Sequence, residues 1–344
     1  MTPRVSVYVG PSHDLYHTSR VLTGLCALHA RGAIALRYVV PSDASTQWLV
    51  RDPVVVCLDV VDVSDRRLAI DLRDGLGISR PILDNVDVYL KRAFYRPEVD
   101  ELPFELAQKV RPFGLNYGCR STASTLRMLG TIGWPLAREG RRGIARLRQY
   151  LSTPGPSTFE QSPDAPVEAR VVFQTRLWSS GEVPEEEVEP LNEGRVAMVR
   201  ALRAAFGDRF VGGLVPTPLA VARYPGEITP HSSRYSEYLA LKKKYLVSVY
   251  TRGVEHSLAF KLGETIAASQ CLVSVPLRYE LPRPLVPGEN YLSFATTDDA
   301  VRACQQLFDD PQLAHAMRTA NHAYYLREVE PAVHAANVLR RVSQ

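Results

Sequence analysis

The 344-residue sequence has no apolar run that approaches the roughly 20 residues needed to span a membrane. It begins MTPRVSVYVG, which leads directly into a strand pattern and lacks the apolar core and cleavage site of a secretory signal. The 41 basic and 37 acidic residues leave a net charge of +4, too small to indicate a nucleic-acid partner. These absences predict a soluble, cytoplasmic protein that does not bind nucleic acid.

Paired cysteines and the familiar cofactor motifs are also missing. No CxxC pair and no Cys/His spacing of a zinc site occurs, so we expect no metal and five reduced core cysteines: Cys26, Cys57, Cys119, Cys271 and Cys304. No GxGxxG follows a strand, and there is no GxxxxGK[ST], HExxH or GxSxG motif. We therefore expect no nicotinamide or flavin cofactor.

Strand and helix patterns alternate along the chain in two halves. The first half predicts strands at 5–9, 34–40, 54–61 and 86–90, helices at 19–29, 121–129 and 142–150, and a polar loop at 111–118. The second half predicts strands at 169–174 and 209–214, an acidic loop at 182–189, and helices at 192–206, 235–243, 297–308 and 311–327.

A proline-rich segment separates the halves. Residues 152–166, STPGPSTFEQSPDAP, contain four prolines and no periodicity, as is typical of a linker. We therefore expect an N-terminal domain over 1–151, a second domain over 167–328, and a last helix within 329–344 that packs back on the first domain. The predicted fold is α/β, with two doubly wound, Rossmann-like domains facing a cleft.

The segment from Tyr245 to Phe294 carries the strongest functional signal. It predicts a buried strand, a Thr-Arg-Gly turn, a helix and a second buried strand. Backbone N–H groups at such a turn suit an anion such as a pyrophosphate, and the polar candidates beside it are Thr251, Arg252, Gly253, His256 and Ser257. An ordinary βα turn is the alternative.

The helix after this turn carries a second group of candidates. Ser257, Lys261 and Glu264 are spaced i, i+4, i+7, which predicts one shared helical face. The Glu264 carboxylate suits ribose hydroxyls, and the Lys261 amine suits phosphate. The alternative is an ion pair on the surface.

Two further clusters follow predicted strands or turns. Arg176, after Gln174 and Thr175, can present its guanidinium to phosphate oxygens, or can pair with the acidic residues Glu185 to Glu187. Glu289 and Asn290, after a glycine, can contact a sugar or form a plain turn.

The first domain offers acceptor-side candidates at two strand ends. Gly10, Ser12, His13 and Asp14 follow the first strand, where His13 or Asp14 can take a proton from an acceptor hydroxyl. Lys91 and Arg92 follow another strand and can neutralise an acidic acceptor. A hydrogen-bonded structural histidine and solvated cations are the alternatives.

A basic amphipathic stretch lies near the end of this domain. Residues 138–148 contain five arginines interleaved with Ile144 and Leu147, and Leu136 precedes them. Such a helix can lie on an anionic bilayer at the inner membrane face, or can simply expose a solvated side.

The motifs of the second half resemble a known family. The sequence reads FQTR at 173–176, FVGG at 210–213, TRGVEHS at 251–257, KLGE at 261–264 and PGENYLSF at 287–294. Over residues 170–325 this resembles the C-terminal half of GT-B glycosyltransferases, in the branch of spore-maturation-type, group 1-like enzymes. Retaining members often carry two glutamates with seven residues between them. Here His256 stands eight positions before Glu264, so both stereochemical outcomes stay open.

The resemblance implies a metal-independent transfer of a sugar from a nucleotide diphosphate-sugar to an acceptor hydroxyl. It implies that Glu264 binds the ribose, and that Arg176, Arg252 and Lys261 bind the diphosphate, with Arg176 also acting in catalysis. The acceptor is a glycan, a lipid-linked glycan or a small molecule. A nucleotide-sugar epimerase and a non-catalytic nucleotide-binding scaffold are the alternatives.

Overall fold

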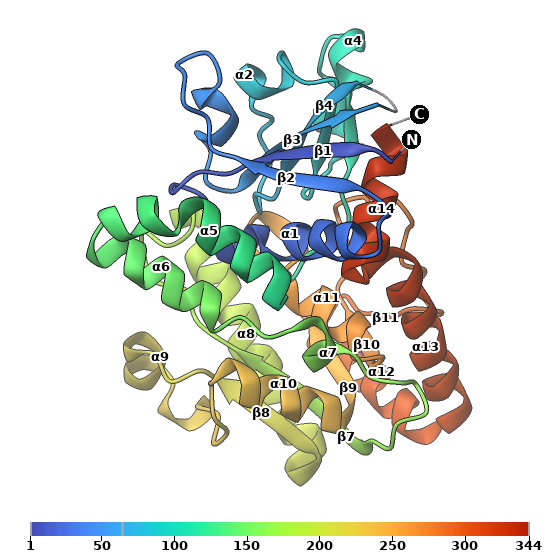
Figure 1. Ribbon diagram of the computed structural model, residues 1–344. Helices are drawn as coiled ribbons and strands as arrows, with labels where there is room; N and C mark the ends of the chain where they lie inside the picture. Colours follow the sequence, from blue (N-terminus) through green and yellow to red (C-terminus); the bar gives the residue numbers. More distant parts are fainter. Residues whose placement is uncertain (1, 63–64, 343–344) are drawn as a thin grey trace. The chain divides into compact units, whose positions relative to one another are not determined.

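The computed structural model describes residues 2–62 and 65–342. They form two compact units. Unit 1 comprises the chain up to Pro156, Tyr279–Arg283 and the chain from Leu326 onward, whereas unit 2 comprises Ser157–Arg278 and Pro284–Tyr325. Both units are α/β structures built around a sheet, which confirms the predicted fold class (Figure 1).

The sheet of unit 1 has the strand order β2-β1-β3-β4-β5-β6. Its strands are β1 (Arg4–Tyr8), β2 (Ala35–Val39), β3 (Val55–Val61), β4 (Arg66–Asp71), β5 (Val88–Lys91) and β6 (Val110–Pro112). Strand β3 runs antiparallel to both β1 and β4, whereas all other pairs are parallel. The sequence interpretation missed β4 and this reversal. The short β3–β4 connection forces the reversal, because only antiparallel neighbours can be joined by a tight turn.

Both faces of this sheet are covered. The side chains of β3 alternate: Val56, Leu58 and Val60 join the larger core, while Val55 and Cys57 join the smaller one. The larger core is shared by α1 (Leu15–Ala30), α5 (Thr122–Arg138), α6 (Arg141–Leu151) and α14 (Pro331–Val342). The smaller core lies beneath η1 (Gln47–Val50), α2 (Arg80–Leu83), α3 (Arg96–Asp100) and α4 (Phe104–Ala107).

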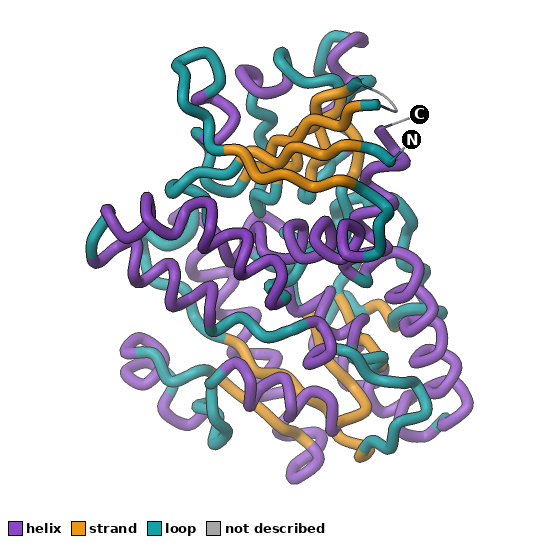
Figure 2. The backbone as a smooth tube through the Cα atoms, in the orientation of Figure 1, coloured by secondary structure: helices purple, strands orange, loops and turns teal. Residues whose placement is uncertain are grey.

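The sheet of unit 2 is entirely parallel, with the order β11-β10-β9-β7-β8. Figure 2 draws the strands of both sheets in orange, with purple helices around them. Its strands are β7 (Glu168–Thr175), β8 (Phe210–Leu214), β9 (Tyr245–Tyr250), β10 (Cys271–Ser274) and β11 (Leu292–Ser293). The strand order reverses between β7 and β9. At such a switch point, crossovers leave in opposite directions and open a crevice at the carboxyl ends of the strands, where ligands of open α/β sheets bind.

Helices cover both faces of this second sheet. On one face, α8 (Glu185–Phe206), α12 (Thr297–Asp309) and α13 (Pro311–Tyr324) share a core with β7, β9 and β10. On the other face lie α10 (Tyr235–Lys244) and α11 (Phe260–Ala267), where Thr265 of α11 contacts Ser248 of β9. The shorter elements are α7 (Pro156–Phe159), η2 (Gly207–Arg209), α9 (Pro218–Arg223), η3 (Pro225–Glu227), η4 (Val254–His256) and η5 (Tyr325–Val329).

Several predicted boundaries were wrong, including the ends of α1, which begins at Leu15, and α5, which extends to Arg138. The acidic segment expected as a loop contributes Glu185, Glu186 and Glu187 to the first turn of α8, where carboxylates offset the positive end of the helix dipole. Helix α11 begins at Phe260, so Ser257 lies outside it and does not share its face with Lys261 and Glu264. The expected loop at 111–118 begins inside β6.

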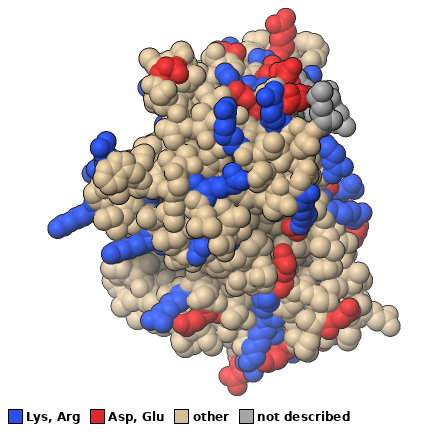
Figure 3. Space-filling view, viewed as in Figure 1, with Lys and Arg blue, Asp and Glu red and all other residues tan. Residues whose placement is uncertain are grey.

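Charged side chains of both signs are spread over the visible face of the molecule (Figure 3). In the part of the chain that the structure describes, no helix is long and apolar enough to cross a membrane.

Candidate functional site

Two polar segments lie at the switch point of unit 2. Strand β7 ends at Thr175 and is followed by Arg176, while β9 ends at Tyr250 and is followed by Thr251 and Arg252. Because β7 and β9 are parallel neighbours, their carboxyl ends reach the same edge of the sheet. The two segments singled out in the sequence are therefore brought together.

The turn after β9 is tightly constrained. A side chain at Gly253 would place its Cβ 2.3 Å from the Ser257 Oγ and 2.9 Å from the Ser257 carbonyl oxygen, so any larger residue would displace Ser257. Glu255 and His256 both have left-handed backbones, with φ of 50° and 60°. The Tyr250 hydroxyl donates to the Ser257 carbonyl (2.7 Å) and accepts from the Ala259 N–H (2.9 Å). These contacts fix the path from the strand into α11.

Arg195 of α8 brings a buried cation to this edge. Its side chain is 8% exposed and donates from Nη1 to the Arg176 carbonyl at 2.6 Å. Burial, together with the charges of Arg176 and Arg252, lowers the pKa of Arg195 to about 10. Its Nε has no hydrogen-bond partner among residues 2–62 and 65–342. A buried guanidinium with an open donor calls for an anionic or polar ligand.

Lys261 adds a second cation from the opposite side of the sheet. Its amine donates to the Gln174 carbonyl, at the end of β7. Burial, and then the charge of Arg195, lowers the pKa of Lys261 to about 7. The nearby carboxylates are engaged elsewhere, because Glu182 pairs with Arg176 (3.0 Å) and Glu187 with Arg252 (3.4 Å). Positive charge thus accumulates at the switch point.

Glu264 lies one helical turn beyond Lys261. It is 3% exposed, and its Oε1 accepts a hydrogen bond of 2.7 Å from the Tyr235 hydroxyl. Its Oε2 is 3.6 Å from the Lys242 amine and has no hydrogen-bond partner among the described residues. This open carboxylate oxygen can accept a hydrogen bond from a ligand hydroxyl.

Lys242 of α10 supports that carboxylate. Its amine donates to the Thr265 hydroxyl at 2.8 Å and to the Lys261 carbonyl at 3.3 Å. Burial lowers the pKa of Lys242 to about 8, although the charge of Glu264 opposes this shift. Lys242 and Glu264 are both buried, and each offsets the charge of the other.

The ring of Trp178 contacts both arginines of the site. The Cζ atoms of Arg176 and Arg195 lie 3.7 Å and 5.5 Å from the centre of its ring. Asn192 bonds both the backbone N–H and the carbonyl of Trp178 at 2.8 Å. The loop that carries Arg176 is therefore anchored to α8.

Sequence reasoning missed four of these residues: Arg195, Trp178, Lys242 and Tyr235. One of them left a recognisable signal. Arg195 interrupts the buried face that Asn192, Val196 and Val199 define on α8, and a cation on a core-facing helix side points to a ligand or a buried partner. The other three depend on contacts between distant segments.

Three other predicted donor-site residues, His256, Asn290 and Glu289, do not join the cluster of buried cations. Burial and the charges of Arg252 and Arg278 lower the pKa of His256, which follows the same turn. Asn290 accepts from the Val286 N–H (2.9 Å) and donates to the Asn321 side chain (3.2 Å), so its amide holds a loop to α13. Glu289 is exposed.

The acceptor-side candidates after β1 make structural contacts in unit 1. The Nδ1 of His13 accepts from the Gly10 N–H and its Nε2 bonds the Val55 carbonyl, both at 3.1 Å. Burial lowers the pKa of His13 to about 4. Asp14 caps α1 through the N–H groups of Tyr16 and His17. Both ring nitrogens of His13 are thus engaged with the backbone, so these contacts do not support the predicted role of His13 as a base.

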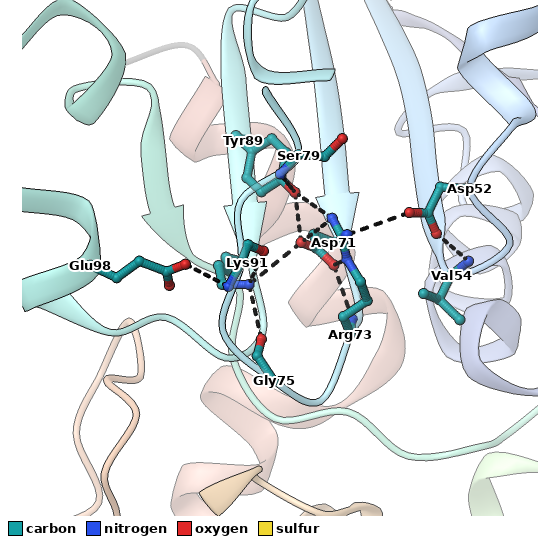
Figure 4. Close-up of polar contacts among 10 residues, drawn as sticks. Asp52, Val54, Asp71, Arg73, Gly75, Ser79, Tyr89, Lys91 and Glu98 are labelled. Atoms are coloured by element: carbon teal, nitrogen blue, oxygen red, sulfur yellow. Dashed lines mark hydrogen bonds and ion pairs between the residues drawn. The ribbon is translucent and has the colours of Figure 1, made fainter. Parts of the chain in front are cut away.

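The other pair in unit 1 is buried, which corrects the expectation of solvated or acceptor-facing cations. The Lys91 amine donates to the carbonyls of Gly75 (3.1 Å) and Gly77 (2.9 Å) and lies 3.6 Å from an Asp71 oxygen. Figure 4 shows Lys91, Asp71 and Arg73 pointing toward one another at the ends of β4 and β5. Arg92 pairs with Asp74. Lys91 therefore holds the loop after β4, and Ser12 similarly bonds the Val50 carbonyl (2.8 Å).

No protein-family model and no curated protein sequence matches the chain. Among solved structures, the C-terminal domain of a group 1 family glycosyl transferase from Francisella tularensis is 9% identical, with a TM-score of 0.36 over 50% of this chain and 96% of that domain. A UDP-GlcNAc 2-epimerase from Neisseria meningitidis bound to UDP-GlcNAc is 12% identical, with a TM-score of 0.39 over 76% of this chain and 63% of that one.

An alpha1,3-fucosyltransferase with GDP is 11% identical, with a TM-score of 0.44 over 99% of this chain and 91% of that one. The solved structures that this chain resembles thus include glycosyltransferases and a nucleotide-sugar epimerase, all at low sequence identity.

Proposed function

We propose that this chain is a glycosyltransferase that moves a sugar from a nucleotide diphosphate-sugar to an acceptor hydroxyl without a metal ion. The observation that carries the proposal is the accumulation of cations at the β7/β9 switch point. Within the described chain, neither Arg195 nor Lys261 has a carboxylate within ion-pair distance. A diphosphate supplies the missing negative charge.

In this proposal, cations bind the diphosphate of the donor and a carboxylate binds its ribose. Arg195 and Lys261 would hold the diphosphate at the strand ends, while the open oxygen of Glu264 would accept from a ribose hydroxyl. Arg176 and Arg252 would exchange Glu182 and Glu187 for phosphate oxygens. The Arg176–Glu182 pair is exposed and therefore cheap to break, since exposed ion pairs contribute only about 0–1 kcal/mol. The Arg252–Glu187 pair is more buried, with side chains 28% and 17% exposed.

The transfer step needs stabilisation of the leaving group. As the bond from the sugar to the diphosphate breaks, negative charge grows on the phosphate oxygens, and preorganised cations lower the energy of that state. The acceptor oxygen forms the new glycosidic bond, and its proton passes to a base. Since His13 is engaged at both nitrogens, we favour the leaving diphosphate as that base.

Nucleotide binding can be tested by calorimetry and thermal melting with UDP, GDP, ADP, CDP and dTDP. One diphosphate at 100 times its dissociation constant should stabilise the protein by about 2.7 kcal/mol. Arg195→Gln should weaken that binding by roughly 10- to 100-fold, the size of a lost charge-assisted hydrogen bond. Arg200→Gln is the matched control, because Arg200 is an exposed arginine of the same helix that pairs with Glu227.

Turnover distinguishes the enzyme classes. The preferred nucleotide-sugar is incubated alone and with a panel of acceptor hydroxyls, and the products are resolved by chromatography. Transfer only with an acceptor supports the proposal. Formation of an epimer from donor alone would replace it with an epimerase, and tight binding without any turnover would leave a nucleotide-binding scaffold.

A further inference from the structure

The hairpin of α5 and α6, residues 122–151, forms an exposed surface unlike the rest of unit 1. Five large apolar side chains of this hairpin are exposed: Leu126, Leu129, Trp134, Ile144 and Leu151. Trp134 is 70% exposed and Leu126 is 65% exposed. An exposed group of this kind marks an interaction site in a folded protein.

Helix α5 carries apolar residues on its solvent side as well as on its core side. Its core side consists of Met128, Ile132 and Leu136, spaced four residues apart and buried. Leu126, Gly130, Gly133 and Ala137 follow the helical repeat on the solvent side, with Trp134 beside them. None of these residues has a charged or hydrogen-bonding group that would favour exposure to water, apart from the indole N–H of Trp134.

The same hairpin concentrates positive charge. It contains six arginines and a single acidic residue, Glu139, which pairs with Arg146. The whole chain has a net charge of only +4, so the remainder is slightly acidic. No described residue forms an ion pair or side-chain hydrogen bond with Arg141, Arg142 or Arg148. Figure 3 shows basic side chains projecting from the part of the visible face that α5 and α6 occupy.

The hairpin is built to hold this surface in place. A Cβ on Gly143 would lie 1.9 Å from the Leu136 carbonyl oxygen, so glycine lets the two helices approach closely. Gly140, at the turn, has a φ of 62°. The buried Tyr150 of α6 also hydrogen bonds to Ser124 of α5 at 3.4 Å. Arginines and apolar side chains are therefore presented together on a fixed support.

We propose that the α5–α6 hairpin docks unit 1 onto an anionic lipid bilayer. Arginines beside a strip of Leu and Trp match the interface of a bilayer, where cations meet lipid headgroups and apolar side chains enter the acyl boundary. A nucleic acid would use the arginines but would leave the apolar strip and Trp134 unburied. The strip therefore favours the membrane.

The test is co-sedimentation of the full chain with vesicles of phosphatidylcholine alone and of phosphatidylcholine mixed with phosphatidylglycerol. Binding is expected only with the anionic lipid and should fall as salt is added. Arg141→Gln/Arg148→Gln should lower the partition coefficient about 30-fold, given the free energy of each basic residue near an anionic surface. Trp134→Ser should lower it about tenfold through lost apolar burial.

Matched controls keep the test specific. Arg31→Gln/Arg51→Gln removes the same charge from other exposed positions of unit 1, and Phe104→Ser removes an apolar side chain that is 76% exposed. Both controls should leave partitioning unchanged, and all variants should melt like the unaltered chain because their sites are exposed. Absence of vesicle binding, equal losses in the controls, or binding to a single-stranded oligonucleotide that Trp134→Ser leaves intact would overturn the proposal.

Discussion

At the scale of single residues, the protein buries two cations, Lys261 and Arg195, that have no carboxylate within ion-pair distance among the described residues. The amine of Lys261 and the guanidinium of Arg195 both lie at the β7/β9 edge. Burial and nearby positive charges lower the pKa of each group. Such an arrangement destabilises the empty site and favours an anion. The pKa of Lys261, about 7, makes this preference measurable near neutral pH.

Affinity for a nucleoside diphosphate should therefore fall as pH rises through about 7. Below that pH the Lys261 amine is charged and attracts phosphate, whereas above it the empty protein must take up a proton to bind. The loss should reach at most about tenfold per pH unit while the bound amine stays protonated. Calorimetry in buffers with different heats of ionisation measures the proton uptake directly. If Lys261→Met takes up protons as the unaltered chain does, Lys261 is not the source.

At the scale of elements, the connection from β9 to α11 positions the candidate site. Three residues separate η4 from the start of α11, and two consecutive left-handed residues turn the chain. Gly253 allows this path because its missing side chain makes room for Ser257. The connection is therefore more elaborate than a simple strand-to-helix turn.

Gly253→Ala should lower the free energy of unfolding by about 1–3 kcal/mol, the usual cost of an added methyl group in a packed place. It should also weaken nucleotide binding, because Arg252 and Ser257 would shift. Gly226→Ala is the control, since no atom lies within 4 Å of a Cβ there. Denaturant unfolding and calorimetry measure both effects, and a stable, tight-binding Gly253→Ala protein would contradict the assignment.

At the scale of the whole molecule, unit 1 is completed by the end of the chain. The Arg20 guanidinium of α1 donates to the carbonyls of Val329 and Leu115. Next to it, a Cβ on Gly24 would lie 2.1 Å from the Pro331 carbonyl oxygen. Residues more than 300 positions apart in the sequence therefore share one core.

Gly24→Ala should separate α14 from α1 and lower the stability of unit 1 by roughly 1–3 kcal/mol. In contrast, Gly130→Ala in α5 should be neutral or stabilise by up to about 1 kcal/mol, because it improves helix propensity in open space. Urea unfolding of both variants distinguishes the two sites. Equal stabilities would show that α14 is not held against α1.

Much of the candidate site was visible in the sequence because it follows strand ends. A parallel strand is a continuous apolar run, and the polar residues that interrupt it mark its carboxyl end. That reasoning found Arg176 and Arg252, whereas Lys261 and Glu264 were found as polar residues on the helix that follows the second strand end. It could not find Lys242 or Tyr235, since nothing local ties α10 to Glu264.

The sequence alone determined the αβ alternation of both units, because period-2 and period-3.6 apolar patterns follow from backbone geometry. Tertiary structure decided the direction of β3, the buried state of Lys91 and the addition of Arg195 to the site. The reason is physical: strand direction and the environment of a charge depend on which distant segments pack together, and these contacts leave no periodic trace in the chain.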